Sequence, residues 1–247
     1  MRKNQGWLVL VAVFSSSALA IGSSQYAFGV FVEPLEQEFG WTRTQINASL
    51  SFAALSSLVS PLVGRIMDRI GARPVMCVSL FLMALSYVLR AFMTELWHWY
   101  GVSALQYLAF PGSALLPAGR LVAMWVPQTR GRMMGVALMG ANFGGFTMPS
   151  LAALVVGLLS WQAGYNVFAL LSVVVGLFAV LSVREVQTEA SDKTSDTVTN
   201  LPGVTLRMAM ASGAFYRVTL GVVLATFTYS AVLPQIIPHL VNEGLTT

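Results

Sequence analysis

The sequence predicts an all-α integral membrane protein, built as a bundle of spanning helices. Hydrophobic residues make up 56% of the 247 positions and charged residues only 10%, whereas about a quarter of the residues in a soluble domain are charged. The mean hydropathy is +0.71. So few charges cannot cover a surface that faces water, whereas a surface that faces hydrocarbon needs none. The apolar runs are also long enough to cross a bilayer.

Seven apolar stretches are long enough to cross a membrane, which takes about 20 residues. They lie near 7–32, 45–66, 75–94, 98–125, 132–159, 163–183 and 216–240. The fourth and fifth exceed the thickness of the hydrocarbon, so we expect them to tilt or to extend beyond it.

The first stretch permits two interpretations. A basic start and the small-residue site Ala18-Leu19-Ala20 fit a signal peptide. The apolar run resumes at Ile21 and continues to Val32, which favours a retained helix.

Basic residues collect in alternate loops, and such loops face the cytoplasm. One side would hold Arg2, Lys3, Arg65, Arg69, Arg73, Arg130, Arg132, Arg184, Lys193, Arg207 and Arg217. The opposite loops hold Glu33, Glu36, Glu38, Glu95 and Glu243, with Arg43. We therefore expect a multi-pass protein of the inner (plasma) membrane with a cytoplasmic N-terminus.

A polar segment divides the chain. Residues 185–203, "EVQTEASDKTSDTVTNLPG", have the composition of a flexible linker, and the next residues resemble a short helix at the membrane surface. The predicted organisation is a six-span bundle at 1–183, a cytoplasmic linker at 184–215, and a seventh span at 216–247 that starts a second, incomplete bundle.

The seventh span resembles the first. Aligning the two places Ala27 on Ala231, Pro34 on Pro238, Gly40 on Gly244 and Thr42 on Thr246. Transporters built from two parallel six-span halves show this kind of correspondence, so we expect the sequence to be a fragment or a truncated form.

The loop between the second and third stretches carries a family motif. "GRIMDRIGAR", residues 64–73, resembles the G-x-x-x-D-R-x-G-x-R signature of the major facilitator superfamily, at the expected position. Within that superfamily, "FGWTR" at 39–43, the segment 125–135 and the span from Gly140 to Pro149 resemble bacterial monocarboxylate and oxalate/formate carriers. The resemblance implies a six-helix bundle and secondary active transport by alternating access, with a small organic anion as substrate and a proton or a counter-anion as its partner in coupling.

One position departs from the carriers that it resembles. Some monocarboxylate carriers have a lysine at the outer end of the first span, where this chain has Glu33. The resemblance therefore assigns no lysine in this chain to receive the proton or the anion.

The motif residues form a predicted cytoplasmic gating motif, made of Gly64, Asp68, Arg69, Gly71, Arg73 and Arg130. Asp68 is near the C-terminal end of its helix, where the helix dipole disfavours an anion. Arg65, Arg69, Arg130 and Arg132 are its predicted cationic partners. The motif either only sets topology, with Gly71 and Pro74 making the turn, or acts as a latch that holds helix ends together in one access state.

Arg120 is the cation predicted to face a substrate. It precedes Trp125 by five residues, or about 7 to 8 Å along a helix. Two interpretations remain open: it extends to the headgroups, or its planar guanidinium binds a carboxylate in the transport path. Arg90 is expected to extend to the interface.

Four polar residues within spans are further candidates for substrate binding: Gln25, Tyr26, Asn142 and Tyr229. Gly140 and Gly144 have the small-xxx-small spacing that allows two helices to approach closely. Pro111, Pro117 and Pro149 are expected to bend their helices.

The sequence contains no pattern for catalysis, a cofactor or a metal. The only cysteine is Cys77 and the two histidines, His98 and His239, are far apart, so no ligand set is recognisable. The basic residues form no stripe that would bind nucleic acid. The expected partner is the lipid bilayer. The alternatives are a transporter of another small solute and a non-transporting receptor or scaffold, whose N-terminus would lie outside.

Overall fold

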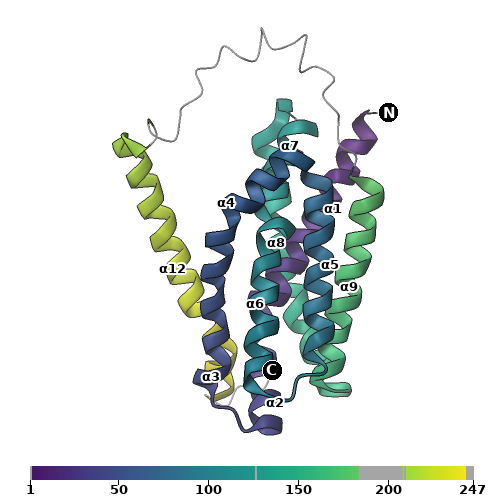
Figure 1. Ribbon diagram of the computed structural model, residues 1–247, viewed down its shortest axis with the longest axis vertical. Coiled ribbons are helices and arrows are strands. Elements are labelled where there is room, and N and C mark those ends of the chain that lie inside the picture. The colour runs from purple at the N-terminus through teal and green to yellow at the C-terminus, as the bar shows by residue number, and fades with distance from the viewer. Residues whose placement is uncertain (1, 126, 184–207, 209, 243–247) are drawn as a thin grey trace. The chain divides into compact units, whose positions relative to one another are not determined.

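A computed structural model describes residues 2–125, 127–183, 208 and 210–242 (Figure 1). Every regular element among these residues is helical, which confirms the predicted fold class. The predicted linker and surface helix fall mostly outside the described residues.

Each of the seven predicted stretches is helical. The elements are α1 (Arg2–Ile21), the π-helix η1 (Gly22–Tyr26), α2 (Phe28–Phe39), α3 (Arg43–Ala48), η2 (Ser49–Phe52), α4 (Ala53–Ile70), α5 (Ala72–Arg90), α6 (Leu96–Ser113), α7 (Leu115–Trp125), η3 (Pro127–Thr129), α8 (Arg130–Leu158), α9 (Trp161–Ser182) and α12 (Gly213–Asn242). Five helical stretches among the described residues are long and apolar enough to cross a membrane: Gln5–Tyr26, Arg43–Ile70, Ala72–Arg90, Arg130–Leu158 and Trp161–Ser182.

The fourth stretch is not one continuous helix, because it breaks at Ala114 between α6 and α7. Pro111 and Pro117 flank the break, and a proline inside a helix leaves the carbonyl four residues earlier without its donor. Hydroxyl groups from other spans bond both carbonyls: Ser56 of α4 donates to Tyr107 O, and Ser16 of α1 donates to Ser113 O. The prediction of bending is confirmed here, whereas α8 continues through Pro149.

The chain forms two units, residues 1–185 and 186–247. In the first unit, α1 packs against α8 and α9, while α5 lies between α6 and α9 (Figure 1). Because successive spans alternate in direction, the bundle has two ends. The Asp68 end carries the end of α4 and the starts of α1, α5 and α8, and the Arg43 end carries the end of α2 and the starts of α3, α6 and α9.

Glycines make the contact between α1 and α8 unusually close. A Cβ added to Gly140 would lie 2.3 Å from Phe14 O, and one added to Gly144 would lie 1.9 Å from Ala18 O. Gly22 in turn faces the Gly144 carbonyl. The spacing of four residues on both helices places these glycines on one face, so the predicted small-xxx-small contact is confirmed.

Two spans expose most of their surface within the first unit. Only 11% of the apolar window is buried in the span Arg43–Ile70, which includes α4, and in α8, against 67% in the span that includes α1. These two helices therefore have free faces for lipid, for another helical unit or for an aqueous path.

Candidate functional site

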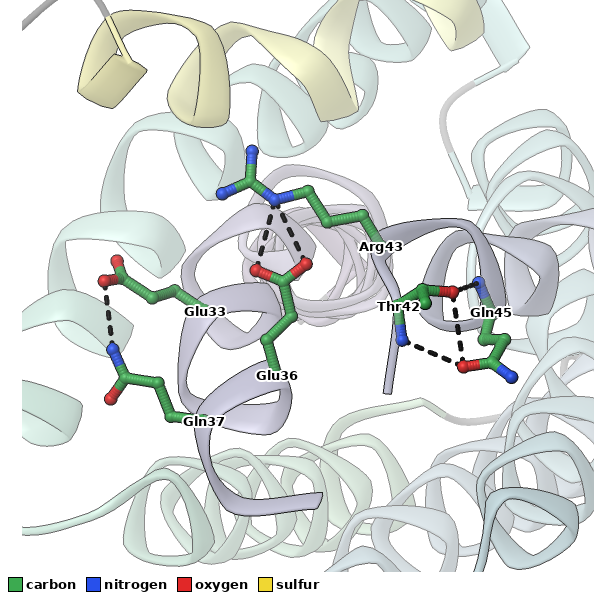
Figure 2. Close-up of polar contacts among 6 residues, drawn as sticks. All are labelled: Glu33, Glu36, Gln37, Thr42, Arg43 and Gln45. Atoms are coloured by element: carbon green, nitrogen blue, oxygen red, sulfur yellow. Dashed lines mark hydrogen bonds and ion pairs between the residues drawn. The ribbon is translucent and has the colours of Figure 1, made fainter. Parts of the chain in front are cut away.

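The junction between the first two spans explains the "FGWTR" segment. Gly40 ends α2 in the left-handed region, with φ of 68°, which favours glycine. Thr42 starts α3 with a capping box: its hydroxyl accepts from Gln45 N, and the Gln45 Oε1 accepts from Thr42 N at 2.9 Å. Arg43 reaches back to Glu36 of α2 at 3.1 Å (Figure 2). The segment is therefore a stop and start signal for helices at the Arg43 end.

Thr42→Ala is expected to lower the free energy of unfolding by about 1 kcal/mol, because it removes the cap of α3. Thermal unfolding in detergent measures it. Arg43→Gln is the matched control, since an exposed ion pair contributes roughly 0.2 to 1 kcal/mol. A larger loss in the control than in Thr42→Ala would contradict this assignment.

Asp68 and Arg120 form an ion pair at the opposite end of the bundle. The Arg120 Nη1 lies 2.8 Å from the Asp68 Oδ1, joining the end of α4 to α7. The Asp68 side chain is 79% exposed and that of Arg120 is 31% exposed. The predicted cationic partners of Asp68 were Arg65, Arg69, Arg130 and Arg132, and the described ion pairs include none of them. The partner of Asp68 is Arg120, which the sequence predicted would face a substrate.

The other motif residues range from buried to exposed. Gly71 ends α4 with φ of 97°, a conformation that L side chains rarely adopt. The Arg73 Nη2 donates to Val180 O of α9 at 2.6 Å, which ties the start of α5 to the end of α9. Arg69 and Arg130 are exposed, and Gly64 is half-buried with open space around its Cα. The motif thus joins α4 to α7 and α5 to α9 at the Asp68 end.

Apart from Arg120, the polar candidates lie in η1, α8 and α12. Gln25 and Tyr26 are half-buried in η1, and a Cβ added to Gly145 of α8 would lie 2.8 Å from the Tyr26 ring. Asn142 is exposed and precedes Gly145 by three residues, which puts both on one face of α8. The side chain of Tyr229 lies outside the described residues. The structure therefore places Tyr26 beside the face of α8 that carries Asn142.

Arg90 lies inside the bundle and does not extend to an interface, so that expectation was wrong. Arg90 is only 5% exposed. Its Nη2 donates to Gln106 Oε1 at 2.5 Å and to Ser103 Oγ at 3.2 Å. The guanidinium lies 4.5 Å from the ring centroid of Trp99 and 4.9 Å from that of Tyr165. Aromatic faces and the C-terminus of α5 stabilise the cation in place of a carboxylate.

The sequence did contain a signal for this cluster. Trp99, Ser103 and Gln106 share one face of α6, because their spacings of four and three residues follow the helical period. Tyr87 and Arg90 share one face of α5 for the same reason. What the sequence could not show is that these two faces meet.

The fold and these sites define a class: a multi-pass membrane protein whose helical bundle carries polar clusters at its ends and along its spans, as membrane transporters do. The chain belongs to the major facilitator superfamily, whose family model matches residues 13–246.

Three curated relatives illustrate the similarity. Monocarboxylate transporter 13 of Rattus norvegicus is 26% identical over 243 residues, covering 97% of this chain and 54% of the relative. The Bos taurus protein of the same name is 25% identical over 246 residues, covering 97% and 55%. A probable anion transporter 3, chloroplastic, of Oryza sativa is 29% identical over 140 residues, covering 55% and 27%. The chain spans about half the length of the first two relatives.

Proposed function

We propose that this chain takes part in secondary active transport of a small organic anion, in the class of a monocarboxylate, by alternating access. The names of the relatives support the substrate class, since two are monocarboxylate transporters and one is a probable anion transporter.

The observation that carries the proposal is Asn142. This amide is exposed near the middle of α8, a spanning helix, and has no hydrogen bond to any described residue. In hydrocarbon an unsatisfied polar group costs several kcal/mol, so the face of α8 that carries Asn142 is expected to line water, a substrate or another polar helix. Tyr26 lies beside that face and Gln25 is its neighbour in η1, which extends the polar surface across two spans.

The Asp68 end is proposed to face the cytoplasm, because its loops hold the excess of basic residues. Asp68 and Arg120 would then form a cytoplasmic latch. A protease-sensitive tag on the N-terminus checks the orientation: cleavage from outside intact cells would contradict it.

The proposed substrate class predicts saturable uptake of a radiolabelled monocarboxylate such as lactate by cells that express the protein. The neutral lactamide is the matched control, because it keeps the size of lactate and lacks its charge. Competition by carboxylates and not by amides supports an anion carrier. Uptake of neutral or cationic solutes, with no carboxylate transported or competing, would overturn the proposal. Dependence on a pH gradient or on an internal anion then separates proton symport from exchange.

A further inference from the structure

A single chain of hydrogen bonds runs from Arg90 to the π-helix of the first span. The Arg90 Nη2 donates to Gln106 Oε1, and the Gln106 Nε2 lies 2.8 Å from the Tyr87 hydroxyl. The Tyr87 hydroxyl lies 2.5 Å from Ser23 Oγ, and Ser23 Oγ donates to Leu19 O at 2.5 Å.

The donors in this chain have only one consistent order. Arg90 can only donate, so the Gln106 carbonyl accepts and its amide donates to the Tyr87 oxygen. Ser23 uses its proton on Leu19 O, so it accepts the proton of Tyr87. All four bonds therefore point from Arg90 toward the first span, and bonds aligned in this way strengthen one another in a low-dielectric interior.

Ser23 belongs to η1, whose backbone departs from the α-helical pattern. Ala27 N donates to Gly22 O at 2.9 Å, a bond across five residues. Single π-turns are rare and often lie at functional sites. Ser23 and the neighbouring Ser24 bond the carbonyls one turn earlier, Leu19 O and Ala20 O.

Two neighbours hold η1 from different sides. The glycines of α8 contact it through Gly22 and the Tyr26 ring, and Tyr87 of α5 contacts it through Ser23. Gln25 and Tyr26 are the half-buried side chains of η1. A shift of η1 on loss of the bond from Tyr87 would therefore move these two residues.

The cost of keeping Arg90 in this place argues for a specific role. Its Nε is buried with no hydrogen-bond partner, and the described ion pairs do not include it. A buried charge without a carboxylate is costly, and an apolar residue could fill the volume. Its planar group instead bonds Ser103 and Gln106 of α6 while lying over aromatic rings, which orients the Gln106 amide toward Tyr87.

We propose that Arg90 is a positioning residue for the transport path. Acting through Gln106 and Tyr87, it holds Ser23 and the π-helix Gly22–Tyr26, and thereby places Gln25 and Tyr26. This inference rests on the proposed function for the role of Gln25 and Tyr26 as path residues.

Tyr87→Phe tests the chain, because it removes the hydroxyl and keeps the ring. The first measurement needs no transport: in a Cys77→Ser background, Gln25→Cys is labelled with a hydrophilic thiol reagent. Loss of the bond is expected to release η1 and to raise the labelling rate about fivefold, which corresponds to about 1 kcal/mol. Ser86→Ala is the matched control, since this buried serine on α5 donates only to Met83 O of its own helix.

The second measurement is uptake of the monocarboxylate, with Gln25 intact and equal amounts of protein at the cell surface. Tyr87→Phe is expected to raise KM about fivefold with little change in the maximal rate, and Arg90→Lys is expected to do the same, because an ammonium cannot reproduce the planar contacts. Ser23→Ala added to Tyr87→Phe should change KM by less than the sum of the two single effects, since both substitutions remove the bond between Tyr87 and Ser23 and Ser23→Ala removes the bond to Leu19 O in addition.

The outcomes separate the two proposals. Labelling rates and KM values in Tyr87→Phe that equal those in Ser86→Ala would overturn the positioning role, as would full additivity of Tyr87→Phe and Ser23→Ala. If the unmodified protein transports no carboxylate, the proposed function fails while the labelling result still decides whether Arg90 holds η1. If Arg90→Lys does not accumulate, Tyr87→Phe alone decides.

Discussion

Gly144→Ala is expected to separate α1 from α8 and to destabilise the bundle strongly. The new Cβ would lie 1.9 Å from Ala18 O, where Cβ contacts below 3.0 Å are not adopted. The obstacle is backbone, so no change of rotamer relieves it, and one helix must move by about 1 Å in a close-packed interior. Overpacking of this kind costs roughly 1 to 3 kcal/mol, and a backbone clash lies at the upper end.

Thermal unfolding in detergent measures this effect. A loss of about 2 to 3 kcal/mol lowers the midpoint by roughly 4 to 12 °C for a chain of this length. Gly157→Ala is the matched control on the same helix, because a Cβ there meets nothing within 4 Å. Its midpoint is expected to stay the same or to rise slightly, since alanine favours the helix more than glycine does. Equal midpoints for the two variants would show that the glycine contact does not hold these helices together.

Features that depend on local sequence were predictable. The seven helical stretches follow from the length of apolar runs, and the contact of Gly140 and Gly144 follows from their spacing along one helix. The turn at Gly71 follows from a glycine between two helices. Each of these signals lies within a few residues of sequence.

The pairings between spans could not be predicted in the same way. Ser16 and Ser56 look like small polar residues of two separate spans, and only the packing shows that they bond carbonyls freed by Pro117 and Pro111. Each hydroxyl has many possible acceptors across the bundle, and the sequence does not show which lies opposite. For the same reason, the chain of hydrogen bonds from Arg90 to Ser23 could not be predicted from the sequence.

The pairing of Asp68 with Arg120 shows this limit at the candidate site. Dipole physics predicted that Asp68 needs a cation, which is correct. Depth in the membrane predicted that Arg120 needs an anion or an exit to the interface. From the sequence these were two separate requirements. In the structure Asp68 and Arg120 satisfy each other through one contact of 2.8 Å.

Asp68→Asn is expected to slow transport by up to about fivefold at unchanged surface expression. An ion pair as exposed as this one contributes up to about 1 kcal/mol, which is too little to hold the fold together. It is enough to change the ratio of two access states about fivefold. Removing the charge therefore disfavours the state that the pair stabilises, and the rate of uptake at saturating substrate reports the change. Glu36→Gln is the control, because it removes the carboxylate of the other described ion pair, at the Arg43 end, and should leave the rate nearly normal.

The role of Arg120 decides how its own substitution behaves. If Arg120 holds Asp68, Arg120→Lys keeps a cation beside the carboxylate, so KM and most of the transport rate are retained. Exchanging the two charges, Asp68→Arg with Arg120→Asp, then restores part of the transport lost in Asp68→Asn. If Arg120 instead binds the substrate carboxylate, Arg120→Lys loses the two-point contact of a planar guanidinium, KM rises steeply, and the exchanged pair restores nothing. A normal transport rate in Asp68→Asn would contradict the proposed latch, because the ion pair would then not stabilise an access state that the protein must leave during transport.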